Sequence, residues 1–144
     1  MKATNFGGAK GHFAKAAISN VGRTELQSSH RIHRHCWTGC LEDLSVWLDS
    51  FENLKIGLTN MVSPDAPRLG QNLQEVARVC PLDRLLLETD APYFTPHFLK
   101  SAGVDYNVPS SAVLVAMRLA EDRHLSVAAV LQQIRLNTRA VYGV

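Results

Sequence analysis

Long apolar runs are missing from this chain of 144 residues. A membrane-spanning helix needs about 18 consecutive apolar residues, but the longest apolar stretch, around Val113–Ala116, is soon interrupted by Arg118. Compositional bias is missing as well, because 46% of the residues are hydrophobic and 19% are charged, as in ordinary globular proteins. These absences exclude a membrane span, a collagen-like fibre and a wholly disordered chain, and they allow one domain with a hydrophobic core.

A strong excess of positive charge is also missing. The formal net charge is +2, and residues 1–24 contain Lys2, Lys10, Lys15 and Arg23 without any acidic residue. The rest of the chain therefore holds 11 basic and 13 acidic side chains. Proteins that bind nucleic acid by charge alone carry a basic face. The nearly equal numbers of basic and acidic side chains after residue 24 do not provide one.

Cysteines are few. Cys36, Cys40 and Cys80 are odd in number and follow no secretory leader, so we expect reduced thiols and a cytoplasmic or nuclear protein. Residues 1–29 are rich in Gly, Ala, Ser and Lys and show no sustained apolar period, which predicts a flexible or unrelated N-terminal leader. The basic, serine-containing composition also fits a mitochondrial transit peptide, but more weakly.

From residue 30 onward the pattern is regular and alternates strands with helices. The predicted strands cover residues 30–37, 54–58 and 84–88, and the predicted helices cover 41–51, 69–80, a segment starting near 109, and 126–142. Residues 91–108 are predicted to form a loop. This repeated order indicates an α/β fold with parallel strands and about three βα units. A complete (β/α)8 barrel usually takes about 250 residues, so three units do not close one.

The densest polar cluster comprises His30, His33, His35, Cys36 and Cys40. His33 and His35 lie on the same face of a strand, and His35 lies at its C-terminal end, where functional groups collect in α/β folds. One interpretation makes His35 a ligand of a catalytic metal whose other ligands come from other strands. A second builds a local tetrahedral zinc site from His33, His35 and the two cysteines, and a third treats the histidines as hydrogen-bonded structural residues. Spacing alone does not choose among them.

A second cluster follows the predicted strand at 84–88. Glu88 and Asp90 lie on one face of its C-terminal end, where buried carboxylates need a metal, a basic partner or hydrogen bonds to offset desolvation. An aspartate at such a position binds a cation and orients its water. The alternative is an aspartate that shapes the turn before Ala91 and Pro92.

The two clusters together resemble the motifs of a known family. Residues 35–39, HCWTG, resemble the HCF[ST]G motif of TatD-type metal-dependent deoxyribonucleases, and residues 81–93 resemble their PLDRLLLETD[AS]PY motif almost without change. Residues 107–109 and 137–143 match the family's N-x-P and closing motifs in the same order. The resemblance covers about residues 30–144. The segment IHRHCWTG is most similar to the animal TatD-domain-containing 2 branch.

The resemblance implies the C-terminal portion of a TIM-type (β/α)8 barrel of the metal-dependent hydrolase class. It implies divalent metal ions (Mg²⁺, Mn²⁺ or Zn²⁺) and hydrolysis of phosphodiester bonds in DNA, and in some members RNA, from the 3′ end. By this resemblance His35 is a metal ligand, and Asp90 is both a metal ligand and catalytic. The positions that it marks as supporting are Glu88, Tyr93, Thr38 and Gly39.

The family also uses an HxH pair on its first strand, a bridging glutamate and a further histidine, and no segment here matches them. The sequence His33-Arg34-His35 also has the HxH pattern, but it belongs to the later strand that carries the HCF[ST]G motif. We therefore expect weakened metal binding, impaired activity and self-association through an open barrel edge. Two alternatives stay open: a non-catalytic fragment that binds a partner, and an amidohydrolase-type enzyme acting on another ester or amide.

Overall fold

The computed structural model describes residues 27–144 except residue 65 and residues 67–70. The strands are β1 (Ile32–Arg34), β2 (Leu54–Leu58) and β3 (Leu85–Leu87). The α-helices are α2 (Leu41–Ser50), α3 (Gln71–Val79), α4 (His97–Ser101), α5 (Ala112–Arg123) and α6 (Val127–Tyr142). Short 3₁₀ turns are η2 (Asn60–Val62), η4 (Leu82–Arg84) and η5 (Pro109–Ser111). Most of the predicted leader, residues 1–26, lies outside the described residues.

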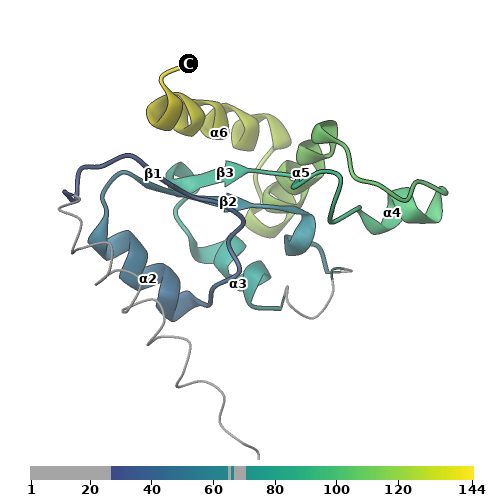
Figure 1. Cartoon of the computed structure of the whole chain (residues 1–144), viewed down its shortest axis with the longest axis horizontal. Coiled ribbons are helices and arrows are strands. Elements are labelled where there is room, and N and C mark those ends of the chain that lie inside the picture. The colour runs from purple at the N-terminus through teal and green to yellow at the C-terminus, as the bar shows by residue number, and fades with distance from the viewer. Residues whose placement is uncertain (1–26, 65, 67–70) are drawn as a thin grey trace, which may run out of the picture.

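The sheet is parallel and has the strand order β1-β2-β3. Ile32 pairs with Leu54 across the first ladder, and Ile56 pairs with Leu85 across the second. Figure 1 shows α2 and α3 below the strands and α6 above β3, while the chain carrying α4 extends from the end of the sheet to which β3 points. All three strands thus deliver their C-terminal ends to one edge, as in a barrel built of βα units.

The middle strand forms the centre of the core. Every residue of β2 is buried, and Leu54, Ile56 and Leu58 have no exposed surface at all. Burying one such side chain stabilises the fold by about 1.5–3 kcal/mol. Helices pack on these strands through further fully buried residues, among them Val76, Ala116 and Val130. The prediction of a strand over residues 54–58 is confirmed to the residue.

Of the other elements, some depart from the prediction and one agrees with it. The strand predicted over 30–37 is shorter, because Cys36 adopts a left-handed backbone with φ of 44° and turns the chain out of the sheet. The segment 91–108, predicted to be a loop, contains the short helix α4. The helix predicted over 126–142 begins as expected at Ser126, whose hydroxyl accepts a hydrogen bond from the Ala129 N–H at 3.1 Å.

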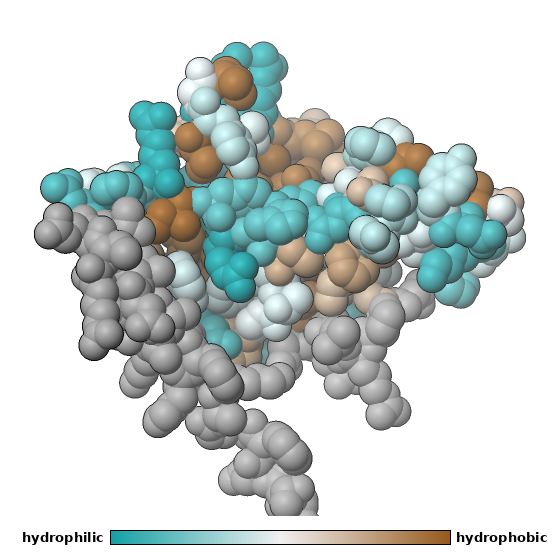
Figure 2. All heavy atoms as spheres, viewed as in Figure 1, coloured by the Kyte–Doolittle hydropathy of each residue, from teal (hydrophilic) through white to brown (hydrophobic). Residues whose placement is uncertain are grey.

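The surface combines a polar band with scattered apolar residues. Figure 2 shows hydrophilic residues across the middle of the face, over the strands, and apolar residues gathered beside α6 and α5. Among the large hydrophobic side chains of these helices that are exposed are Val113, Met117, Leu131, Leu136 and Tyr142. Within the described residues, none of the helices combines the length and the apolar character that crossing a membrane requires.

Candidate metal centre

Two strand ends meet at the centre of the polar cluster. His35 follows β1 directly after Arg34, and Glu88 follows β3 directly after Leu87. The two strands flank β2 in a parallel sheet, so their C-terminal ends lie at the same edge. Side chains 53 positions apart in sequence therefore come into hydrogen-bonding distance.

The imidazole of His35 lies between two carboxylates. Its Nδ1 is 2.6 Å from Glu88 Oε1, and its Nε2 is 3.3 Å from Asp90 Oδ1. The hydrogen bond to Glu88 raises the pKa of His35 above its ordinary value of 6.5, with the Asp90 charge acting in the same direction. The structure thus brings together the histidine and both carboxylates that the sequence singled out, and their roles stay predictions.

Glu88 is held by more than His35. Its side chain is 9% exposed, and its Oε2 accepts a hydrogen bond from the Cys36 backbone N–H at 2.7 Å. Burial alone raises the pKa of this carboxyl, but the contacts with His33, the Cys36 N–H and His35 outweigh burial and lower it below 4.5. Glu88 is therefore a carboxylate at neutral pH, surrounded by groups that favour its negative charge.

His33 joins the same cluster from within β1. Its Nε2 is 2.7 Å from Glu88 Oε1, and its Nδ1 is 2.5 Å from the hydroxyl of Tyr142 at the end of α6. The Nε2 atom is buried, and the Glu88 carboxylate is the charged group that it contacts. The rings of His33 and His35 are 6.0 Å apart, which confirms that the two histidines share a face.

Gly57 makes room for the glutamate. It is the fourth residue of β2, and a Cβ built on it would collide with the carboxylate of Glu88. The middle strand thus leaves a hollow in which the carboxylate sits. A glycine inside an otherwise apolar strand marks a close approach of another group, so the sequence carried a signal for this contact that the motif comparison did not use.

The donor set fits a divalent cation. One ligand atom each from His33, His35 and Glu88 lies within 4.8 Å of the others, and among the described residues this is the group of at least three potential ligands that meets that limit. Two imidazole nitrogens and a carboxylate oxygen are ligands of zinc and similar ions. These ligand atoms lie close enough together for one ion to bind all three.

The cysteines do not join this group. The Cys40 thiol donates to Asp43 Oδ2 at 3.3 Å, at the start of α2. Burial, followed by the nearby Asp90 carboxylate, raises the pKa of the Cys36 thiol to about 12. Among the described residues, the group of ligand atoms within 4.8 Å of one another contains no cysteine, so the structure does not gather the local zinc site of two histidines and two cysteines.

Asp90 shapes the turn that its sequence position allowed and also contacts His35. It adopts a left-handed backbone with φ of 50°, and its carbonyl accepts the Tyr93 N–H at 2.8 Å, so it does shape a turn. Its side chain nevertheless faces His35. Aspartate tolerates left-handed φ better than most residues, and turn and site therefore use the same residue without conflict.

The loop that carries Asp90 is fixed by Asn107. This asparagine is 3% exposed, and its amide donates to the Thr89 carbonyl at 2.8 Å. Its Oδ1 accepts the Val108 N–H at 2.9 Å and the hydroxyl of Ser111. The sequence motif placed Asn107 in the family pattern without a role, and the structure gives it one: it ties the residue before Asp90 to the loop that leads into α5.

The remaining predicted positions lie around the centre rather than in it. Gly39 accepts a hydrogen bond from the Trp37 indole at 2.9 Å, and a Cβ on Gly39 would come within 2.7 Å of that ring. Thr38 is exposed, and Tyr93 is 72% exposed. Within the described residues, neither side chain forms a hydrogen bond to the cluster.

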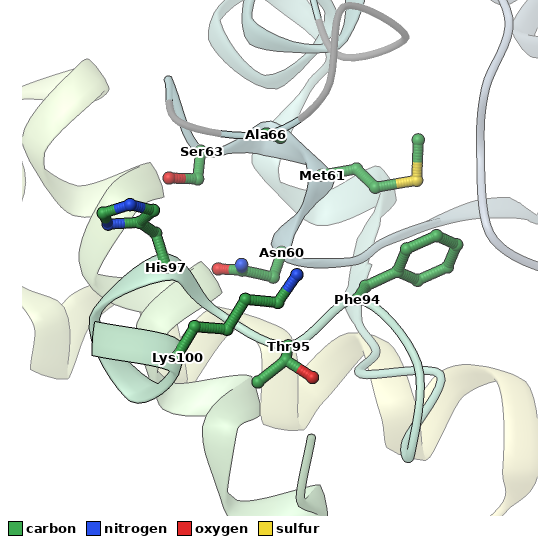
Figure 3. A pocket seen from close by; sticks show the side chains of 8 residues that line it. All are labelled: Asn60, Met61, Ser63, Ala66, Phe94, Thr95, His97 and Lys100. Atoms are coloured by element: carbon green, nitrogen blue, oxygen red, sulfur yellow. The ribbon is translucent and has the colours of Figure 1, made fainter. Parts of the chain in front are cut away.

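A pocket opens beside the centre at the same edge of the sheet. Its volume is about 270 Å³, and its walls come from η2, which follows β2, and from the segment that follows β3. Figure 3 shows the Lys100 ammonium pointing toward Asn60 and the His97 ring toward Ser63, with Phe94 on the opposite side. His97 is isolated in the sequence, and no sequence motif gives it or Lys100 a role.

Comparison with known proteins gives consistent results. A family model described as TatD related DNase matches residues 11–143. The human protein named 3′-5′ RNA nuclease TATDN2 is 30% identical over 114 residues, which are 79% of this chain and 15% of that protein. The 3′-5′ ssDNA/RNA exonuclease TatD of Erwinia amylovora is 36% identical over 110 residues, which are 76% of this chain and 41% of the relative.

A solved structure gives the same result for the fold. The crystal structure of YJJV, a TATD homolog from Escherichia coli K12, superposes with a TM-score of 0.70 at 25% identity, over 91% of this chain and 47% of that chain. This confirms the predicted fold class, a portion of a TIM-type (β/α)8 barrel with parallel strands. The chain spans less than half the length of these relatives.

Proposed function

The chain belongs to the TatD-related DNase family, and on that premise we propose that it is a metal-dependent hydrolase of phosphodiester bonds, acting from the 3′ end of single-stranded DNA and RNA. The relatives named above carry 3′-5′ nuclease activity in their names. The observation that carries the proposal is the meeting of His35 with Glu88 and Asp90 at the C-terminal edge of the sheet. That edge is where barrel enzymes place their chemistry.

The metal-binding residues in this proposal are His35 and Asp90, and the ion is Mg²⁺, Mn²⁺ or Zn²⁺. When bound, such an ion supplies activation of a water molecule and neutralisation of charge on the scissile phosphate. The ligand atoms of His33, His35 and Glu88, which lie within 4.8 Å of one another, support a cation at this place.

The chain's own side chains have separate tasks. Asp90 presents a carboxylate, 16% exposed, that orients the attacking water and accepts its proton. Glu88 holds the His35 ring through the 2.6 Å contact at Nδ1. Asn107 keeps Thr89, and with it Asp90, in place through its hydrogen bond to the Thr89 carbonyl. Each task follows from a contact that already exists without substrate.

The neighbouring pocket supports a single nucleic-acid strand as substrate. Its lining combines a cation, Lys100, with an exposed aromatic ring, Phe94, and with the polar side chains of Asn60, Thr95 and His97. Proteins bind single strands through positive groups along the backbone and aromatic rings on which bases stack. One nucleotide next to the cleaved bond would occupy this pocket, which compensates for the weakly acidic balance of residues 25–144.

We also propose that the edges of the sheet take part in self-association. Among the described strands, β1 and β3 are each paired on one side only. An unpaired strand edge presents free N–H and C=O groups to other chains. Sedimentation velocity over a range of concentrations tests this point, and a single 16 kDa species throughout contradicts it.

The hydrolysis proposal is tested on the purified chain with 3′-labelled single-stranded DNA and RNA. Mg²⁺, Mn²⁺ and Zn²⁺ are added separately, and Asp90→Asn is compared with Asp105→Asn, which removes the charge of an exposed loop carboxylate outside the cluster. We expect metal-dependent shortening from the 3′ end that is lost in Asp90→Asn and kept in Asp105→Asn. Absence of cleavage by a folded, metal-loaded sample contradicts the proposal and favours a non-catalytic role. Cleavage of ester or amide substrates instead favours the amidohydrolase alternative.

A further inference from the structure

Exposed aromatic rings gather on one short stretch of this chain. Within the described residues five aromatic side chains are exposed, and four of them lie on residues 93–106, which we call the aromatic segment: Tyr93, Phe94, Phe98 and Tyr106. The two tryptophans and Phe51, by contrast, belong to the hydrophobic core or pack against it. Gathered apolar surface marks an interaction site, whereas single scattered residues do not. The aromatic segment is therefore a candidate binding surface.

The aromatic segment begins beside the candidate metal centre. The Tyr93 N–H donates to the Asp90 carbonyl at 2.8 Å, so the first ring follows directly on the turn that Asp90 shapes. Phe94 lines the pocket next to the centre, together with His97 and Lys100 (Figure 3). Figure 1 shows the chain around α4 extending away from the sheet, beyond the end to which β3 points. A long, chain-like substrate held at the centre can therefore lie along this segment.

Hydrogen bonds hold the aromatic segment in one shape. Asn107 closes it, because its backbone N–H donates to the Pro92 carbonyl at 2.9 Å and its side-chain amide donates to the Phe94 carbonyl at 3.4 Å. The Thr95 hydroxyl donates to the Asp105 carbonyl at 3.2 Å and joins the two limbs of the segment. Phe94 has a positive φ of 53°, which a bulky residue adopts only where the surrounding contacts impose it. Rings displayed on a loop that is already shaped lose less entropy on binding.

The faces of these rings are free, and charge near them is sparse. Within the described residues, none of the four rings is paired with another aromatic ring or with a cationic side chain. Residues 93–106 contain one lysine, Lys100, and one acidic residue, Asp105. A partner that binds here gains more from ring contacts than from ion pairs. Unpaired bases fit this description, since every base has a π-face that stacks on an aromatic ring.

We propose that the aromatic segment is a stacking surface for the part of a single nucleic-acid strand that extends beyond the pocket, with unpaired bases lying against Phe98 and Tyr106. The inference rests on the proposed function and deepens it, because it assigns the part of the substrate remote from the cleaved bond. Bases inside a duplex are already paired and stacked, and exposing them costs free energy. The segment therefore selects single strands over duplexes and tolerates any base sequence.

The test measures binding without metal, so that no strand is cleaved. Fluorescence anisotropy compares labelled thymidine strands of two and six nucleotides with a blunt-ended hairpin duplex. We expect the six-nucleotide strand to bind at least about 10-fold more tightly than the two-nucleotide strand or the duplex. Phe98→Ala and Tyr106→Ala should each weaken binding of the longer strand about 5- to 10-fold and leave binding of the shorter strand unchanged.

Matched variants separate ring stacking from general apolar contact. Phe98→Leu keeps an apolar side chain without a ring and should lose binding as Phe98→Ala does, whereas Phe98→Tyr keeps a ring and should bind like the unaltered chain. Leu136→Ala truncates an exposed apolar side chain of α6, outside the segment, and should also bind like the unaltered chain. Phe98 and Tyr106 are 56% and 61% exposed, so these variants keep the fold, and thermal unfolding verifies this.

Three results overturn the inference. The first is a six-nucleotide strand that binds no more tightly than the two-nucleotide strand, the second is full binding by Phe98→Leu, and the third is unchanged binding by both alanine variants. Alanine variants that alter the sedimentation of the chain and leave strand binding unchanged would show that the rings cover a contact with protein instead.

The two proposals fail separately. Ring-dependent binding of single strands by a chain that cleaves none upholds the stacking surface and contradicts the hydrolase. If the chain cleaves long strands, the stacking surface predicts that Phe98→Ala raises KM and leaves kcat unchanged. Cleavage in which Phe98→Ala changes neither quantity upholds the hydrolase and contradicts the stacking surface.

Discussion

The two ends of β3 are held by the same kind of contact and serve different purposes. At the beginning of the strand, the buried amide of Asn137 donates to the carbonyls of Leu82 and Leu85, at 2.8 and 2.7 Å. Beyond its end, the buried amide of Asn107 donates to the Thr89 carbonyl. Both asparagines are 3% exposed and both lie in the family motifs. The first joins a helix to the sheet, and the second fixes the loop that carries Asp90.

The difference shows that the N-terminal end of a barrel strand contributes mainly to stability, whereas its C-terminal end carries the candidate site. The N-terminal end is tied down further by Arg84, which donates to the carbonyls of Phe51 and Leu54 at 3.1 and 3.2 Å. Among the described residues, no group of three potential metal ligands forms there. The C-terminal end gathers two histidines and two carboxylates. Residues at the first end are therefore expected to affect unfolding, and residues at the second to affect catalysis.

The matched pair of asparagines tests this division most strongly. Asn137→Ala leaves two carbonyls at a buried position without donors and should lower the free energy of unfolding by about 2–3 kcal/mol. Its folded fraction should keep the activity of the unaltered chain. Asn107→Ala should cost about 1–3 kcal/mol and in addition reduce turnover, since the Asp90 loop loses its anchor. Urea unfolding and cleavage assays well below the melting temperature separate the two quantities, and equal turnover in both variants contradicts the division.

Gly57→Ala tests whether the middle strand, β2, contributes to metal binding as well as to stability. The added methyl group collides with the Glu88 carboxylate and displaces it from its contacts with His35 and the Cys36 N–H. We expect about 10-fold weaker metal binding together with a loss of about 1–3 kcal/mol in unfolding free energy. Calorimetry and thermal unfolding of the same sample measure both. A large loss of stability without loss of metal affinity would show that the hollow serves packing instead.

The pocket provides a smaller effect that concerns binding alone. Lys100→Glu should weaken binding of a short single-stranded DNA several-fold and lower the slope of log affinity against log salt concentration by about one. Arg135→Glu makes the same change of charge on an exposed site of α6 and should have a smaller effect. Fluorescence anisotropy in the absence of metal measures both. Equal effects of the two changes contradict a specific role of the pocket.

The smallest expected effect depends on pH. The raised pKa of His35 means that its contribution to stability is complete below pH 6.5 and is lost as the pH rises through the folded-state pKa. The lowered pKa of Glu88 means that its contribution is present above pH 4.5 and is lost as the pH falls through its folded-state pKa. His35→Gln should therefore destabilise the metal-free chain most between these values, by less than about 1 kcal/mol because His35 is mostly exposed.

This prediction is checked by urea unfolding in the presence of a chelator at pH 5.5 and at pH 8.5. His124→Asn controls for the loss of an exposed histidine outside the cluster. A difference that grows toward alkaline pH would mean that the contact between His35 and Glu88 does not favour the charged ring.

The sequence predicted the interior of the fold better than its edges. The strand at 54–58 was predicted to the residue, and every one of its residues is buried. The strand at 30–37 was predicted too long, since nothing in its composition reveals that Cys36 takes a positive φ. The helix α4 was missed because five residues are too few to show a helical period.

The site was predicted in part for similar reasons. Motif order placed His35 and Asp90 at strand ends, and the parallel sheet then brought them together. The contact between the His33 ring and the Tyr142 hydroxyl joins residues that lie 109 positions apart, and no local pattern in the sequence connects the two. The pairing of Glu88 with Gly57 likewise depends on the register between β2 and β3, in which Gly57 lies opposite Leu86.

The hollow at Gly57 has a consequence for protein design. The carboxylate of Glu88 occupies the volume that a side chain of the adjacent strand would normally fill. A designer who grafts residues 33–39 and 88–90 onto another barrel copies the polar cluster and still loses its geometry, unless the strand between them bears a glycine at that level. The transferable unit is thus the two strand ends together with the glycine between them.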